Sequence, residues 1–127
     1  MSVEWERLAE RAWEVRDNAH THGPTRVGAA VLARDGRVFA GCNVEHRFRS
    51  HDVHAEVNAL STMVADGADQ AIAVLIAAER DHFTPCGSCL DWIFELGGPE
   101  CLIAFQARPG QEFQVVSSKD LMPHYPR

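Results

Sequence analysis

The chain has 127 residues, of which 46% are hydrophobic and 24% charged, a composition typical of globular proteins. This length suffices for one hydrophobic core, so we expect a single domain over residues 1–127. No apolar run approaches the ~20 residues that a membrane span needs, and residues 1–7 are too polar for a secretory signal. The sequence therefore predicts a cytoplasmic protein without a membrane partner.

Acidic side chains outnumber basic ones by 18 to 12, which gives a formal net charge of −6. Nucleic-acid binding draws much of its strength from Lys and Arg contacts to phosphates, so a small-molecule substrate is favoured, although Arg47 and Arg49 form a local basic spot. Four cysteines without a signal peptide indicate thiols or metal ligands and not a disulfide framework. Cys42 and Cys101 lie in apolar, strand-like segments and are expected to be buried thiols.

The first part of the chain predicts a helix followed by a hairpin. Apolar residues recur at helical spacing over residues 3–19, and breaker residues at 20–25 end that helix. Two apolar runs follow, at 27–32 and 38–44. The Asp-Gly pair between them is typical of a tight turn joining two antiparallel strands.

A polar loop at residues 45–51 leads into a second predicted helix at 53–65. Asp52 is a plausible N-cap for this helix. Its predicted core stripe consists of Val57, Leu60 and Val64. The apolar run at 71–78 then reads as a central strand covered on both faces.

The remaining elements complete an alternating pattern. Thr84 is expected to cap a third helix, with Pro85 at its first position. Two more strands at 101–105 and 113–116 and a short helix at 118–122 close the chain. This order predicts an α/β fold, a three-layer α/β/α sandwich around a mixed five-stranded sheet with its third strand in the centre.

Four side chains dominate the functional interpretation: His54, Glu56, Cys86 and Cys89. One imidazole and two thiolates offer zinc three ligands and leave its fourth position open, as in catalytic zinc sites. Two thiolates also balance the charge of zinc, so a coordinated water remains easy to ionise. Glu56 would take a proton from this water and then deliver it to the substrate.

Both candidate ligand segments are predicted to open a helix. The N–H groups and dipole at a helix start favour negative charge, so we expect depressed pKa values for Cys86 and Cys89. Spacing of three residues places the two sulfurs on one side of their helix. The two helices must then converge at their N-termini for His54 to join the site.

Other interpretations of these residues stay open. The Cys-x-x-Cys pair could form the redox dithiol of a thiol–disulfide oxidoreductase, and a non-catalytic zinc module would use the same ligands. His46 and His51 are interpreted as loop residues and not as ligands.

The order and spacing of these motifs resemble those of the zinc-dependent deaminases. The resemblance is closest to the free-nucleoside branch of the cytidine deaminase superfamily, which includes blasticidin S deaminase. The resemblance spans nearly the whole chain. It includes the Val-Gly-Ala-Ala segment at 27–30, the hairpin and following segment at 35–45, the Pro-Cys-Gly-Ser-Cys motif at 85–89, and the segment at 120–123.

The resemblance implies a role for each matching residue in the hydrolytic deamination of a cytosine nucleoside. Asn43 and Glu45 would bind the sugar 3′-hydroxyl. The backbone N–H of Ala55 would hold the pyrimidine O2, and the carbonyl of Thr84 would receive the amino group. The resemblance also implies one zinc ion per chain and a homotetramer, with a dimer as the second possibility, and no nucleic-acid partner.

Three departures from the family pattern stand out, the first of which involves two positions. Small tetrameric members usually have a third cysteine at the position of His54 and an arginine at that of Val57, so here one thiolate and one compensating cation are missing together. Thr25 replaces an aromatic residue that packs on the base, for which Phe48, Phe83 and His22 are candidate substitutes. Arg49 replaces a tyrosine near the sugar 5′ end and suggests an acidic or modified 5′ group. A modified or antibiotic cytosine nucleoside, a nucleotide or another amino-heterocycle is the alternative substrate.

Overall fold

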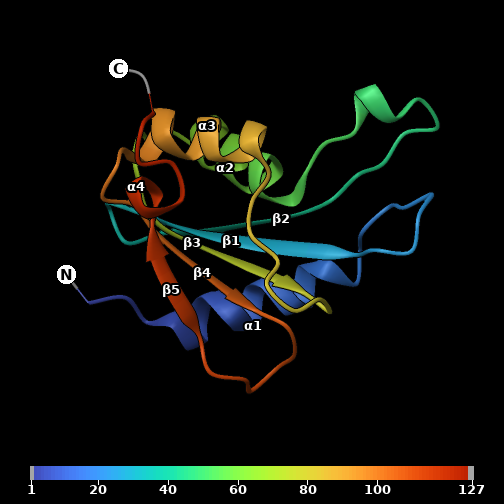
Figure 1. The fold of residues 1–127 in the computed structure, drawn as a ribbon, viewed down its shortest axis with the longest axis horizontal. Coiled ribbons are helices and arrows are strands. Elements are labelled where there is room, and N and C mark those ends of the chain that lie inside the picture. Colours follow the sequence, from blue (N-terminus) through green and yellow to red (C-terminus); the bar gives the residue numbers. More distant parts are fainter. Residues whose placement is uncertain (1, 126–127) are drawn as a thin grey trace.

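The computed structural model describes residues 2–125 as one five-stranded sheet with helices on both faces (Figure 1). The strands are β1 (Val27–Ala33), β2 (Val38–Cys42), β3 (Ala71–Ala78), β4 (Leu102–Gln106) and β5 (Gln114–Ser117). The helices are α1 (Trp5–Arg16), the 3₁₀ turn η1 (Arg49–His51), α2 (Ala55–Ala65), α3 (Gly87–Gly97) and α4 (Ser118–Leu121).

The strand order is β2-β1-β3-β4-β5, so β3 lies at the centre as the sequence predicts. Strands β3 and β4 are parallel and the other neighbouring pairs are antiparallel. The predicted mixed sheet is therefore confirmed. The strand β3 is buried almost throughout, because helices cover both of its faces.

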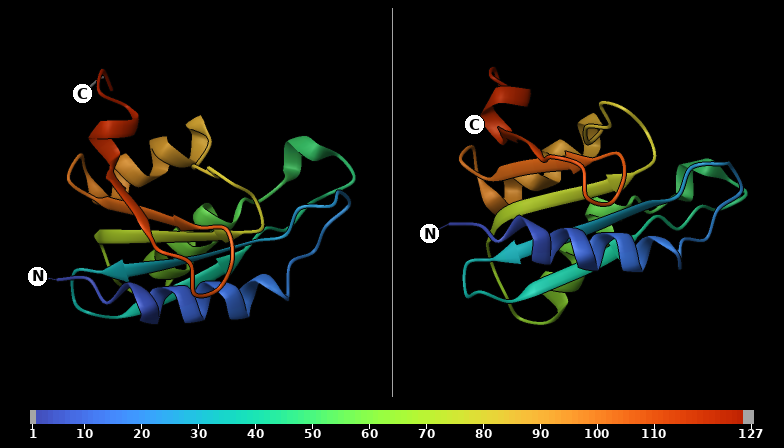
Figure 2. Two further views of the ribbon diagram at one scale, coloured as in Figure 1. Left: turned by 60° about the horizontal axis from the view of Figure 1, so that its bottom comes forward. Right: turned by 90° about the horizontal axis from the view of Figure 1, so that it is seen from below.

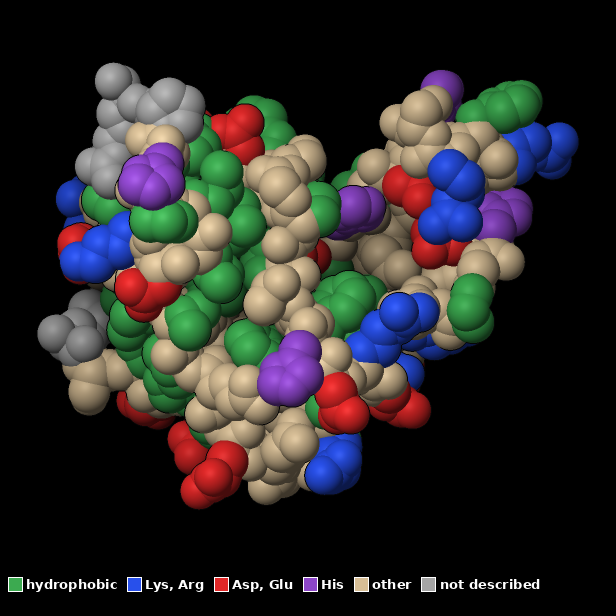
Figure 3. Space-filling model, viewed as in Figure 1, with side chains coloured by type: hydrophobic (Ala, Val, Ile, Leu, Met, Phe, Trp, Pro, Cys, Tyr) green, Lys and Arg blue, Asp and Glu red, His purple; other side chains and the backbone are tan. Residues whose placement is uncertain are grey.

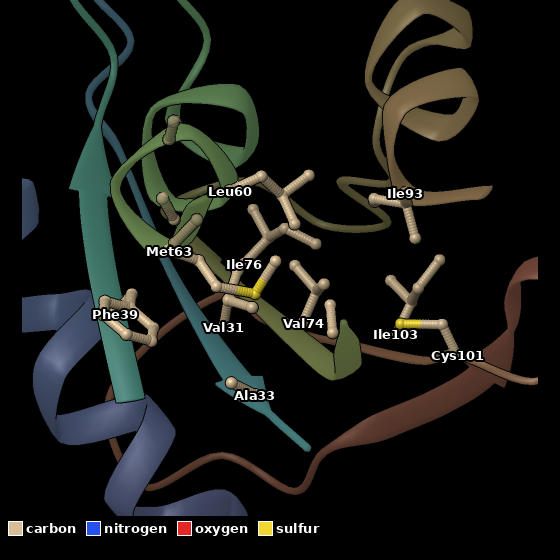
Figure 4. Close-up of a cluster of buried hydrophobic side chains, with 14 of the residues drawn as sticks. Val31, Ala33, Phe39, Leu60, Met63, Val74, Ile76, Ile93, Cys101 and Ile103 are labelled. Carbon is tan, nitrogen blue, oxygen red and sulfur yellow. The ribbon is translucent and has the colours of Figure 1, made fainter. Parts of the chain in front are cut away.

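Helix α1 covers one face of the sheet, and α2 and α3 cover the other (Figure 2). Leu8 and Ala12 of α1 are fully buried against the first face. On the second face, Leu60 and Met63 of α2 and Ile93 of α3 point toward the strand residues Val31, Val74 and Ile103 (Figure 4). This packing fixes the positions of both helices that carry the candidate ligands.

Two glycines permit the close approach of helices to the sheet. A Cβ at Gly28 would lie 1.9 Å from the carbonyl oxygen of Ala12 in α1. A Cβ at Gly41 would lie 2.5 Å from the backbone nitrogen of Ala59 in α2. Any side chain at either position would push a helix away from the sheet.

The predicted caps of the two ligand-bearing helices are wrong. Helix α2 begins at Ala55 with His54 as N-cap, and α3 begins at Gly87 with Cys86 as N-cap. The carboxylate of Asp52 instead accepts a hydrogen bond from the backbone N–H of His46 at 2.7 Å. Neither helix has a capping side chain, because the candidate metal ligands occupy the N-cap positions.

The predicted core stripe of α2 is also partly wrong. Leu60 is buried as expected, but Val64 is 50% exposed and Val57 is only half-buried. The buried face instead contains Ala59 and Met63. The close approach of β2 at Gly41 to the backbone of Ala59 favours a small side chain at that position. No helix within residues 2–125 combines the length and apolar character needed to cross a membrane.

Candidate zinc centre and catalytic cavity

The starts of α2 and α3 converge on one face of the sheet and bring the three predicted ligands together. The Nδ1 atom of His54 lies 3.4 Å from Sγ of Cys86 and 3.3 Å from Sγ of Cys89. All three ligand atoms lie within 4.8 Å of one another. Among the residues that the structure describes, His54, Cys86 and Cys89 form the one group of three or more His, Cys, Asp or Glu side chains that lie close enough together to bind a metal ion.

These distances fit a tetrahedral zinc ion. Zinc bonds of about 2.0–2.1 Å to nitrogen and about 2.3 Å to sulfur imply a nitrogen–sulfur edge of roughly 3.5 Å. Cys89 is fully buried, whereas His54 and Cys86 are exposed, so the triad opens toward solvent on one side. All four cysteines are free thiols, and Cys42 and Cys101 are buried as predicted. The donor set is thus that of a catalytic zinc site with one open position.

Glu56 lies beside this triad in the first turn of α2 and is only 4% exposed. Burial raises the pKa of its carboxyl group above the usual value, against the opposing effects of its own backbone N–H, of His54 and of Cys89. Burial of this kind favours the protonated form of a carboxyl group and suits a residue that must hold a proton during a reaction.

The thiol of Cys89 does not follow the prediction made from its helix position. Burial raises its pKa, and the neighbouring carboxylate of Glu56 raises it further. The helix start alone therefore does not ionise Cys89, and the predicted depression is wrong for this residue. A coordinated divalent cation would deprotonate the thiol outright.

A cavity of about 370 Å³ opens onto the triad. The molecule is visibly hollowed between its main body and the projecting segment that carries η1 (Figure 3). Every predicted site residue except the buried Cys89 lines this cavity: Asn43, Glu45, Arg49, His54, Ala55, Glu56, Thr84 and Cys86. A larger cavity of about 930 Å³ lies between α1 and residues 106–115, and none of the predicted site residues lines it.

Asn43 and Glu45 are buried in the cavity wall and bonded within the protein. The Oδ1 atom of Asn43 accepts the N–H of Val27 at 2.9 Å, and its Nδ2 donates to the carbonyl of Thr25 at 3.0 Å. The Oε1 atom of Glu45 accepts the N–H groups of His22 and Gly23 at 2.7 and 2.8 Å. These two N–H groups and the charge of Arg49 hold the pKa of Glu45 below its usual value.

The guanidinium of Arg49 is engaged by two carboxylates. It lies 3.0 Å from Oε2 of Glu45 and 2.7 Å from Oδ2 of Asp52. Asp52, which sequence reasoning assigned to a helix cap, therefore fixes the η1 segment through Arg49 and His46. The positive charge of Arg49 is largely compensated before any ligand binds.

Comparison with known proteins identifies the family. The model of the cytidine and deoxycytidylate deaminase zinc-binding region matches residues 3–105. The chain belongs to this family. It is therefore a zinc-dependent deaminase whose His54, Cys86 and Cys89 are placed to hold one metal ion.

Relatives match the deaminase over most of its length. The cytidine deaminase of Mycobacterium tuberculosis is 32% identical over 109 residues, covering 84% of this chain and 82% of the relative. The crystal structure of cytidine deaminase from Burkholderia pseudomallei is 31% identical with a TM-score of 0.88, covering 97% of this chain and 98% of that one. The Mycobacterium leprae cytidine deaminase structure is 30% identical with a TM-score of 0.83, covering 97% and 100%.

Of the three candidates for base stacking, only Phe83 lines the catalytic cavity of the deaminase. Phe48 is 62% exposed and stacks on His46 in the projecting segment. Sequence reasoning missed a further residue of this wall, Arg80, whose Nη2 donates to Oγ1 of Thr25 at 2.8 Å. The only sequence signal for this contact is the replacement of an aromatic by threonine at position 25.

Proposed function

We propose that the deaminase hydrolyses the exocyclic amine of a cytosine nucleoside, converting cytidine or deoxycytidine to the uracil form and ammonia. The observation that carries this proposal is the buried carboxyl of Glu56, which lies beside three zinc ligands at the wall of a nucleoside-sized cavity. A zinc ion held by His54, Cys86 and Cys89 would acidify a water molecule in its open position.

Glu56 is proposed as the proton carrier of the reaction. Its carboxylate takes one proton from the attacking water and delivers it to the ring nitrogen next to the reacting carbon. It then takes the second proton from the newly added hydroxyl and passes it to the amine, so that the carbon–nitrogen bond breaks and ammonia leaves. The burial of Glu56 beside the three ligands supports this role, and the same burial raises the pKa of its carboxyl group, which favours the protonated form that a proton carrier must pass through.

Backbone and side-chain groups of the cavity would orient the nucleoside. Ala55 is the first residue of α2, where N–H groups have no partner within the helix, and this N–H is proposed to bind the pyrimidine O2. The carbonyl of Thr84 is proposed to accept from the amino group. Asn43 and Glu45 are held rigidly in the same wall and are proposed to bind the sugar 3′-hydroxyl.

A homotetramer is the proposed assembly, with a dimer second. Val53 and Trp92 are 39% and 48% exposed and line a depression with His54, beside the catalytic cavity. Apolar side chains next to an open site favour burial against further copies of the chain. Light scattering on the purified protein tests this assembly, and Trp92→Glu is expected to yield smaller species.

We also propose a cytoplasmic location, where four free thiols stay reduced.

Ammonia release and loss of cytosine absorbance test the proposed activity. Cytidine and deoxycytidine should both be converted by the zinc-loaded protein, and Glu56→Gln should convert both at least about a hundredfold more slowly. A preparation with no bound metal, no deamination and a titratable dithiol that reduces disulfides would instead support the oxidoreductase alternative.

A further inference from the structure

Arg80 occupies a position from which it can reach a bound ligand. It lies two residues beyond β3, at the carboxyl end of the central strand, where ligands bind in open α/β sheets. A tight turn, in which the N–H of Arg80 donates to the carbonyl of Ala78 at 2.7 Å, fixes its backbone. Its side chain lines the catalytic cavity together with Glu56 and Phe83.

The charge of Arg80 has no counterion among residues 2–125. Within these residues its guanidinium donates a hydrogen bond to the neutral hydroxyl of Thr25, at 2.8 Å. The neighbouring Glu79 pairs instead with Arg16 at 3.0 Å. A guanidinium carries five N–H donors, so most of those on Arg80 remain available to a ligand in the cavity.

Arg49 provides a contrast within the same cavity. Its guanidinium already contacts the carboxylates of Glu45 and Asp52. A further anion at Arg49 would meet these two negative charges, whereas at Arg80 it would meet an uncompensated cation. These two contacts favour Arg80 over Arg49 as the binding group for an anion, although the departure from the family pattern lies at position 49.

We propose that Arg80, held in place by Thr25, binds an oxyanion on the substrate, so that the enzyme selects cytosine nucleosides carrying a phosphate or a carboxylate. This inference rests on the proposed deamination and specifies its substrate class. A guanidinium matches the paired oxygens of phosphate and carboxylate and binds them by charge-assisted hydrogen bonds. A neutral hydroxyl in the same place would gain less from an unpaired cation.

The test compares kcat/KM for cytidine, for cytidine 5′-monophosphate and for cytidine 5′-carboxylic acid. The wild-type enzyme should prefer at least one of the two anionic substrates. Arg80→Ala should lower kcat/KM for that substrate by about ten- to hundredfold, mainly through KM, as expected for loss of a charged hydrogen bond. The loss for cytidine itself should be several-fold smaller than the loss for that anionic substrate. The two anionic arms distinguish phosphate from carboxylate.

Matched variants separate ligand binding from folding. Arg80→Lys should retain part of the preference, because it keeps the charge but not the planar fork. Arg34→Ala removes an exposed arginine in the turn between β1 and β2, where it pairs with Asp69, and it should leave all three substrates unaffected. Thr25→Val should weaken the preference less than Arg80→Ala does.

Three results would overturn the proposal: a wild-type preference for cytidine, equal losses for neutral and anionic substrates in Arg80→Ala, or a charge-selective loss in Arg49→Ala only. Failure of the proposed function is distinct, since no substrate would then release ammonia. In that case calorimetric binding of cytidine 5′-monophosphate to the zinc-loaded wild type and to Arg80→Ala still decides the role of Arg80.

Discussion

Two walls of the cavity differ in how their polar groups are used. The metal-binding wall consists of His54, Cys86 and Cys89, and the wall of Asn43 and Glu45, proposed above to bind the sugar, is called here the sugar-facing wall. His54, Cys86 and Cys89 contact mainly one another, at helix starts that carry no capping side chain. Asn43 and Glu45, in contrast, are buried and hydrogen-bonded to the backbone of residues 22–27. The polar groups of the metal-binding wall are thus arranged to bind a metal ion. Those of the sugar-facing wall already form hydrogen bonds with the protein backbone.

This difference separates two kinds of mutational effect. Changes in the metal-binding wall should remove zinc or chemistry. Changes in the sugar-facing wall should also destabilise the fold, because buried backbone groups lose their partners. Activity and unfolding measurements on the same variants therefore test the contrast directly.

The largest effect is expected from Cys86→Ala. Loss of one of three ligands should reduce bound zinc from about one ion per chain to near zero and abolish deamination, because the open metal site no longer forms. Metal analysis and an ammonia assay measure both quantities. Cys42→Ala is the matched control: this buried thiol lies in β2 outside the ligand group, and its variant should keep zinc. Full zinc content in Cys86→Ala would contradict the ligand assignment.

Glu56→Gln should separate chemistry from metal binding. We expect kcat to fall by about 10²–10⁴, the usual contribution of a positioned proton carrier, while zinc content stays near that of the wild type. Glutamine has nearly the same shape, so the fold should be retained. Unchanged activity in this variant would support the interpretation of the site as a non-catalytic zinc module.

Asn43→Ala should reveal the structural part of the sugar-facing wall. The buried N–H of Val27 and the carbonyl of Thr25 lose their partner, which should lower the free energy of unfolding by about 1–3 kcal/mol. Urea denaturation measures this loss, with kcat/KM for cytidine followed in parallel. Asn43→Asp keeps the acceptor for Val27 and should lose less stability. Wild-type stability in Asn43→Ala would break the contrast between the two walls.

A smaller, pH-dependent effect is expected at Glu45. Its pKa is lowered in the folded protein by the N–H groups of Gly23 and His22 and by Arg49. The ionised form therefore contributes stability above the ordinary carboxyl pKa, and this contribution is lost as the pH falls through the folded pKa. Glu45→Gln should thus be destabilised relative to the wild type at pH 7, by about 1–2 kcal/mol, and the difference should shrink at pH 3. Thermal unfolding at both pH values measures it, and a constant difference would contradict this origin.

The pattern of residues predicts most of the fold and the chemical centre. The uninterrupted apolar run at 71–78 identifies the central strand, and the joint occurrence of His54, Glu56 and the Cys-x-x-Cys pair identifies the zinc site. Helix caps were predicted wrongly at Asp52 and Thr84, because capping preferences are local and do not register that the N-cap positions here hold metal ligands.

Contacts between distant segments could not be predicted from local patterns. The hydrogen bond between Arg80 and Thr25 joins residues 55 positions apart, and it forms only because β3 and the segment before β1 end at the same edge of the cavity. The bonds of Asn43 to Val27 and Thr25 likewise depend on the pairing of β1 with β2. Such contacts follow from the register of the sheet and not from any motif.

X-ray absorption spectroscopy at the zinc edge tests the central claim most directly. Protein purified without added metal should show one zinc per chain with two sulfur ligands at about 2.3 Å and two nitrogen or oxygen ligands at about 2.0–2.1 Å. A first shell of four sulfurs, a shell without sulfur, or protein without zinc and with Cys86 and Cys89 joined in a disulfide would contradict the proposed catalytic centre.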